Sequence, residues 1–125
     1  EYIWIEPRVG MWDSKKVGIA APPIKTKDGW ILFYHGVSDE DGFYRLGVCL
    51  LDLKDPMKVI ARFDEPIFEP ETKYELEGQI PNVVFPCGIV KDEGKFFIYY
   101  GGADSVIGVA TVDENELLKS LKLYK

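Results

Sequence analysis

The chain has 125 residues, of which 46% are hydrophobic and 29% are charged, and this balance is typical of one globular domain rather than a disordered chain. Twenty-one acidic residues against fifteen basic ones give a net charge of −6. Such a charge excludes a general nucleic-acid or anionic-membrane surface, so a bound anion would need a few local cations.

No hydrophobic run approaches the ~20 residues that span a bilayer, and no basic-then-hydrophobic leader opens the chain. We therefore expect a cytoplasmic protein with no membrane partner.

Cys49 and Cys87 are too few for a disulfide framework and are predicted to be buried free thiols. The chain begins with Glu1, and its opening EYIWIEP reads as a continuation of an upstream segment, so we expect a fragment.

The first specific strand pattern is GWILFYHG (residues 29–36), which ends on His35, the only histidine in the chain. The polar turn KTKDGW precedes this strand, and the polar loop VSDEDGFY leads to a further strand around residues 46–48. Glycine closes the turn, as a tight hairpin requires, and the Val, Ile, Phe and Tyr residues favour strands.

The same layout recurs further along the chain. A shift of 65 residues aligns segment 29–36 with GKFFIYYG (residues 94–101) and places His35 on Tyr100. A polar, glycine-bearing turn precedes each copy, and a glycine–valine strand follows each copy after a polar loop. Each copy therefore predicts a strand, a turn, a strand, a loop and a strand.

Helical signals are confined to two places. A short turn is predicted at Asp55–Met57, where proline suits a first helical position. The stretch DENELLKSLK predicts a short C-terminal helix, with Asp113 as its N-cap and Glu116 in the capping-box position.

A four-stranded antiparallel unit that recurs along a chain indicates a β-propeller, whose blades cannot bury their faces alone. Propellers close with four to eight blades, and this chain holds about two. We predict an all-β fold with about two propeller blades and a short C-terminal helix. Residues 1–125 are expected to form a single partial domain.

Longer motifs resemble a known family. The stretches that carry the resemblance are WDSKKVGIAAPPIKTKDGWILFYHGV, YRLGVCLLDLKDPMKVIARFDEPIFEPETKYELEG, NVVFPCGIV and YYGGAD. They resemble the C-terminal part of glycoside hydrolase family 130, from about Trp12 to Ala110. The resemblance implies a five-bladed propeller and an inverting β-mannoside phosphorylase, although a minority of the family are β-mannosidases.

The reaction implied by the resemblance is phosphorolysis, in which inorganic phosphate attacks the anomeric carbon of a β-mannoside and yields α-mannose 1-phosphate. The family's general acid is an aspartate of an earlier blade with no counterpart here, so we expect no catalytic residue and no activity from this chain alone. The resemblance assigns phosphate contacts to Lys16 in KKVG and His35 in YHG. A compact cation and an N–H donor suit an anion in a partly desolvated cleft.

On the sugar side, Asp104 at the end of YYGGAD matches an aspartate that contacts mannose hydroxyls in the family. A carboxylate suits that role because it accepts hydrogen bonds from hydroxyl groups. Phe85 in NVVFPCG is expected to line the same subsite. The expected partners are a mannose-containing oligosaccharide and phosphate as co-substrate, with no cofactor, no metal and no nucleic acid, and the sequence is compatible with a homo-oligomer.

Simpler roles remain open for each of these residues. His35 alone could cap a strand, and Lys16, beside another lysine, could be a solvated surface charge. Asp104 could stabilise a turn after two glycines. Arg45 and Arg62 are interpreted as structural ion-pair partners rather than phosphate ligands.

Two other functions also remain open. A non-catalytic propeller fragment would at most bind sugar or assist assembly, and the missing upstream blades favour this alternative for the chain alone. A β-mannosidase of the same family would use water in place of phosphate. The presence of both Lys16 and His35 argues against a hydrolase, because a hydrolase gains nothing from an anion site.

Overall fold

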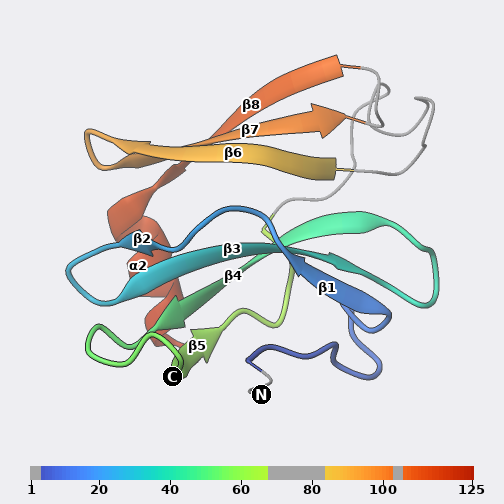
Figure 1. The fold of residues 1–125 in the computed structure, drawn as a ribbon, viewed down its shortest axis with the longest axis horizontal. Helices are drawn as coiled ribbons and strands as arrows, with labels where there is room; N and C mark the ends of the chain where they lie inside the picture. The colour runs from blue at the N-terminus through green and yellow to red at the C-terminus, as the bar shows by residue number, and fades with distance from the viewer. Residues whose placement is uncertain (1–3, 68–83, 103–105) are drawn as a thin grey trace.

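A computed structural model of the chain describes residues 4–67, 84–102 and 106–125 (Figure 1). These residues form two antiparallel β-sheets and a C-terminal helix. The first sheet holds β1 (Lys16–Ile19), β2 (Ile24–Lys25), β3 (Trp30–Val37), β4 (Tyr44–Leu51) and β5 (Val59–Arg62). The second sheet holds β6 (Val84–Asp92), β7 (Lys95–Gly102) and β8 (Val106–Asp113), and helix α2 (Glu114–Lys122) follows. The predicted all-β fold with a short C-terminal helix is confirmed.

From β3 onward in the first sheet, and throughout the second, strands that follow one another in the chain pair side by side. The first sheet has the order β1-β3-β4-β5, with β2 also pairing with β3, and the second has the order β6-β7-β8. Figure 1 shows one sheet above the other, with α2 near one end of the pair. The two predicted copies of strand, turn, strand, loop and strand are therefore both present.

The turn between β6 and β7 follows from its sequence. Asp92 pairs with Lys95, which leaves Glu93 and Gly94 as a two-residue loop. Both loop residues have positive φ, 48° at Glu93 and 77° at Gly94. Two positive φ values are the signature of the type I′ turn, whose twist matches that of the flanking strands.

The main hydrophobic core lies between the two sheets and the helix. Alternate residues of β3 and β4 meet alternate residues of β7, because side chains of a strand point to opposite faces in turn. The fully buried members from the strands are Ile31, Phe33, Leu46, Val48, Leu50, Phe96 and Ile98. The helix adds Leu117, Leu118 and Leu121 to the same core.

Asp113 begins the helix as predicted. Its side chain accepts a hydrogen bond of 3.0 Å from the backbone N–H of Glu116, which satisfies one of the unpaired N–H groups of the first turn. The segment Asp55–Met57 forms a turn closed by the N–H of Lys58 donating to the carbonyl of Asp55 at 2.9 Å. It is not a helix.

The other face of the first sheet carries a second, smaller core. Leu32, Tyr34, Cys49 and Leu51 are buried there. Burial raises the pKa of the Cys49 thiol to about 12, so this cysteine is an unreactive packing residue, in agreement with the sequence. The side chain of Cys87 lies outside the described residues.

The register of the strands corrects the predicted alignment of the repeat by one residue. Tyr34 lies opposite Gly47, and Tyr100 lies opposite Gly108. In each case the phenol ring covers the glycine, because a Cβ added there would lie 2.6 Å from the tyrosine Cζ. Tyr100 is therefore the counterpart of Tyr34, and the prediction that aligned it with His35 was wrong.

The described part of the chain contains no helix that is long and apolar enough to cross a membrane.

Candidate functional site

Lys16 and His35 lie on the same face of the first sheet. In the antiparallel pairing of β1 with β3, Gly18 lies opposite His35 and Lys16 lies opposite Val37. Residues that face each other across a ladder, and residues two apart on one strand, point to the same side of the sheet. The register therefore brings the two residues that the resemblance assigns to phosphate to one face, at the edge strand β1.

A glycine makes room for the histidine ring. A Cβ atom added at Gly18 would lie 2.5 Å from both Cε1 and Nε2 of His35. The imidazole therefore lies directly against the backbone of β1, two residues from Lys16. This contact explains why a glycine stands two positions after the lysine in KKVG.

Tyr44 is a third member of this group, and sequence reasoning missed it. The Nζ atom of Lys16 lies 5.2 Å from the centroid of the Tyr44 ring, within cation–π range. The centroids of the His35 and Tyr44 rings are 5.9 Å apart. Tyr44 lies opposite Val37 in the pairing of β3 with β4, and its place at the head of YRLGV is the only signal in the sequence.

The electrostatics of the group favour an anion. Burial and then the nearby charge of Lys16 lower the pKa of His35 below its ordinary value of 6.5. Both causes disfavour a second positive charge, so the imidazole is held neutral beside a cation. An anion placed here would be attracted by the Lys16 ammonium and could accept hydrogen bonds from both side chains.

The two residues assigned to the sugar subsite stay predictions. The backbone of Phe85 pairs with Gly101 in the second sheet, but its side chain is outside the described residues. Asp104 lies outside the described residues altogether.

Both arginines form the structural ion pairs that the sequence interpretation expects. Arg45 forms an ion pair of 2.7 Å with Asp41 in the loop before β4. Arg62 in β5 forms an ion pair of 2.7 Å with Asp13, whose side chain is fully buried. Both guanidinium groups therefore have structural carboxylate partners.

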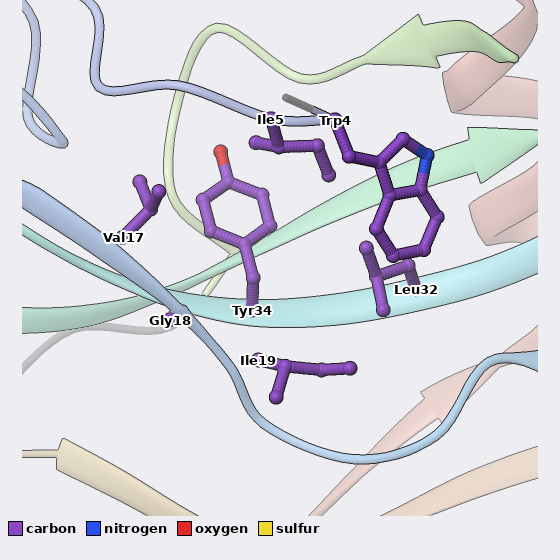
Figure 2. A pocket seen from close by; sticks show the side chains of 7 residues that line it. All are labelled: Trp4, Ile5, Val17, Gly18, Ile19, Leu32 and Tyr34. Carbon is purple, nitrogen blue, oxygen red and sulfur yellow. The ribbon is translucent and has the colours of Figure 1, made fainter. Parts of the chain in front are cut away.

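An apolar hollow opens on the opposite face of the first sheet. Figure 2 shows the side chains that surround it, which include Trp4, Ile19, Leu32 and Tyr34. None of the described residues that line the hollow carries a charged side chain, so this lining does not suit phosphate. Since Tyr100 is the counterpart of Tyr34, the corresponding face of the second sheet is the one that packs against the first sheet. The hollow therefore corresponds to a sheet-packing face rather than a ligand site.

Among the described residues, no group of three His, Cys, Asp or Glu side chains could hold a metal ion.

Two repeated antiparallel sheets that pack face to face define the chain as part of a β-propeller, and the Lys16–His35 pair is its candidate functional site. The sequence model of glycoside hydrolase family 130, described as beta-1,4-mannooligosaccharide phosphorylase, matches residues 2–123. The chain belongs to this family.

Individual relatives agree with this assignment. The chain is 56% identical over 113 residues to a beta-1,2-mannobiose phosphorylase of Thermoanaerobacter sp. (strain X514), which covers 90% of the chain and 37% of the relative. The solved structure of a beta-1,2-mannobiose phosphorylase from Listeria innocua, in complex with beta-1,2-mannobiose, superposes with a TM-score of 0.90 and 39% identity. That match covers 95% of the chain and 33% of the solved chain. The chain thus spans about a third of the length of these relatives.

A third relative differs in its described activity. Its structure superposes with a TM-score of 0.77 and 36% identity over 87% of the chain and 33% of the solved chain. The description of this structure says that family 130, a family of mannoside phosphorylases, also contains glycoside hydrolases that target beta-1,2 mannosidic linkages in Candida mannan.

Proposed function

We propose that the protein is an inverting β-mannoside phosphorylase and that Lys16 and His35 form part of its phosphate subsite. The observation that carries the proposal is their convergence on one face of the first sheet, beside Tyr44. The lowered pKa of His35, caused by burial and then by Lys16, leaves a neutral imidazole beside a cation, and these two side chains can donate hydrogen bonds to one anion. The phosphorylase relatives support the same reaction.

In this reaction an oxygen of phosphate forms a bond to the anomeric carbon while the bond to the leaving-group oxygen breaks. That oxygen takes up a proton from a general acid, for which the described residues of this chain offer no candidate. Attack from the side opposite the leaving group gives α-mannose 1-phosphate. The role of Lys16 and His35 is to hold the phosphate in line for attack and to offset its negative charge.

The substrates are a mannose-containing oligosaccharide and inorganic phosphate, and Asp104 and Phe85 are proposed to contact the mannose. The family model is described for β-1,4-linked substrates, whereas the two phosphorylase relatives named above act on β-1,2-mannobiose. We propose the mannosyl group as the common element and leave the linkage to experiment. A cytoplasmic location and a homo-oligomeric state are further predictions.

Phosphate-dependent kinetics test this proposal. The protein, expressed at its full natural length, is assayed with β-1,2- and β-1,4-mannobiose over a range of phosphate concentrations. The proposal expects release of α-mannose 1-phosphate and a rate that depends on phosphate. Replacing Lys16 with alanine should raise the KM for phosphate or lower kcat by roughly ten- to a hundredfold, equivalent to about 1.5–3 kcal/mol for one charge-assisted contact.

A hydrolase is the second candidate, because one solved relative is described with hydrolases of this family. The products separate the two reactions, since a hydrolase releases free mannose at a rate that does not respond to phosphate. Equal phosphate dependence in the wild type and Lys16→Ala would show that Lys16 does not contact phosphate.

A further inference from the structure

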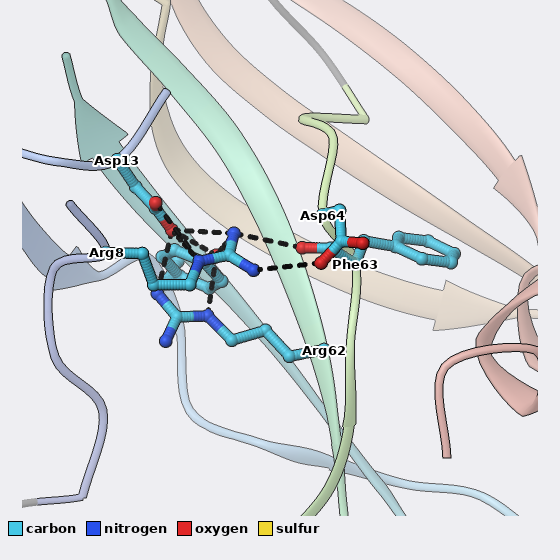
Figure 3. Close-up of polar contacts among 6 residues, drawn as sticks. Arg8, Asp13, Arg62, Phe63 and Asp64 are labelled. Carbon is cyan, nitrogen blue, oxygen red and sulfur yellow. Dashed lines mark hydrogen bonds and ion pairs between the residues drawn. The ribbon is translucent and has the colours of Figure 1, made fainter. Parts of the chain in front are cut away.

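A cluster of charged and polar side chains is buried on the face of the first sheet opposite the candidate phosphate site. Figure 3 shows its core, in which dashed lines join the carboxylate of Asp13 to the guanidinium groups of both Arg8 and Arg62. The Asp13 side chain has no exposed surface. Its Oδ2 atom accepts hydrogen bonds from Nη2 of Arg8 at 2.9 Å, Nη2 of Arg62 at 2.7 Å and the hydroxyl of Tyr34 at 2.9 Å.

The cluster ties together segments that are distant in the sequence. Arg8 belongs to the segment before β1 and also donates to the carbonyl of Phe63 at 3.0 Å, just after β5. Arg62 belongs to β5 and donates through Nε to the hydroxyl of Tyr34 in β3 at 3.1 Å. Burial raises the pKa of Tyr34, so its hydroxyl stays protonated and can donate to Asp13. The segment before β1 is thereby fixed to β3 and β5.

The cluster also lies next to the residues of the phosphate site along the chain. Tyr34 directly precedes His35 in β3, and Asp13 lies three residues before Lys16. Asp13 packs on the backbone of β3, because a Cβ added at Gly36 would lie 2.6 Å from the Asp13 Cβ. The cluster therefore holds the start of β1 against one face of β3, and at the same point Lys16 and His35 lie on the opposite face of this strand pair.

We propose that Asp13 is a positioning residue for phosphate: with Arg8, Arg62 and Tyr34, it sets the placement of Lys16 relative to His35. This role rests on the proposed phosphate subsite. Asp13 does not itself contact phosphate, since the β1–β3 pair lies between the cluster and the site.

The direction in which phosphate binding changes when the charge of Asp13 is removed distinguishes a positioning role from a purely electrostatic one. Asp13→Asn removes a negative charge and leaves two arginines on the back of the phosphate site. By charge alone, that change strengthens the attraction for an anion. If the cluster acts by position, the same change lets β1 shift on β3 and weakens phosphate binding.

The test measures the KM for phosphate and the KM for mannoside separately in the full-length protein. For Asp13→Asn, we expect a rise in the phosphate KM of roughly ten- to a hundredfold, the scale of a misplacement by ~1 Å. The KM for mannoside should change much less. Tyr34→Phe keeps the ring and removes only the shared hydroxyl, so it should also raise the phosphate KM, but by a smaller factor. If Asp13→Asn does not fold, Tyr34→Phe alone tests the positioning role.

Asp41→Asn is the matched control, because it makes the same change in an exposed ion pair with Arg45. It should leave both KM values close to those of the wild type. A second measurement follows the imidazole resonance of His35 by NMR, identified by its absence in His35→Gln. Its titration midpoint should rise in Tyr34→Phe, because Lys16 no longer sits at the distance that lowers it.

An unchanged phosphate KM in the cluster variants overturns the positioning role, and so does an equal rise in the two KM values. A lower phosphate KM in Asp13→Asn would mean that the cluster acts only through charge, which overturns it as well. A wild-type protein whose activity does not depend on phosphate overturns the proposed function and this role with it, so the two failures are distinguishable.

Discussion

Gly18 offers a sharp test of the candidate phosphate site, because the ring of His35 lies where a side chain would begin. A Cβ at Gly18 would lie 2.5 Å from Cε1 and Nε2 of His35, whereas ordinary contact begins at 3.4 Å. In Gly18→Ala the ring must therefore retreat by about 0.9 Å, the difference between these two distances. The backbone of Gly18 is not in the left-handed region, so this contact is the main strain that alanine meets.

The expected cost falls on function rather than on stability. The atoms in the way belong to the far end of the histidine side chain, which can turn aside, so the stability cost should lie at or below the ~1–3 kcal/mol of core overpacking. A contact group displaced by ~1 Å can lower the rate by up to about a hundredfold. We expect kcat/KM for phosphate to fall roughly ten- to a hundredfold, or about 1.4–2.7 kcal/mol of transition-state stabilisation.

The assay compares initial rates over a range of phosphate concentrations for the wild type, Gly18→Ala and Gly88→Ala. Gly88 is the matched control, since it lies in β6 and a Cβ added there has no atom of the described residues within 4 Å. Gly88→Ala should keep the wild-type phosphate dependence. If folded Gly18→Ala does so too, or if both variants lose the same amount, His35 does not contact phosphate in the position described.

Three further outcomes follow from the structure. Asp113→Ala should cost about 1 kcal/mol of stability, measured by denaturant unfolding, because the N–H of Glu116 loses its capping oxygen. Leu121→Ala should cost about 2–5 kcal/mol in the same measurement, because Leu121 is fully buried between the helix and the sheets. Because the folded state lowers the pKa of His35, the unfolded state binds more protons below pH 6.5, and stability should fall as the pH drops through this region. Thermal melts of wild type and His35→Gln at several pH values check this sign, and an equal slope in both proteins would contradict it.

Local patterns predicted the local structure well. The strand GWILFYHG, the hairpin at Glu93–Gly94 and the cap at Asp113 each depend on residues near one another in the chain, and each is confirmed. Turn conformation and strand alternation are determined by residues that are close together in the chain, so they can be predicted from a single sequence.

Register and long-range contacts were harder to predict. The alignment of Tyr100 with His35 rested on the glycines that flank each strand, whereas the structural repeat follows the contact of each tyrosine with a glycine on the next strand. A shift of one residue moves a side chain to the other face of a sheet, so this error exchanged the two faces. Tyr44 and Asp13 were missed because their partners are brought close only by strand pairing.

The alternation of side chains along β3 connects the packing of the sheet to its candidate site. Tyr34 points to the buried Asp13 cluster, and its neighbour His35 points to the face that carries Lys16. A strand with both faces occupied has a strongly specified register, because a slip would bury the wrong residues on each side. The second sheet keeps the tyrosine, as Tyr100, but has Gly101 at the position after it. The repeat therefore preserves the tyrosine that packs the sheets together, and the first copy has His35, the proposed phosphate contact, where the second has a glycine.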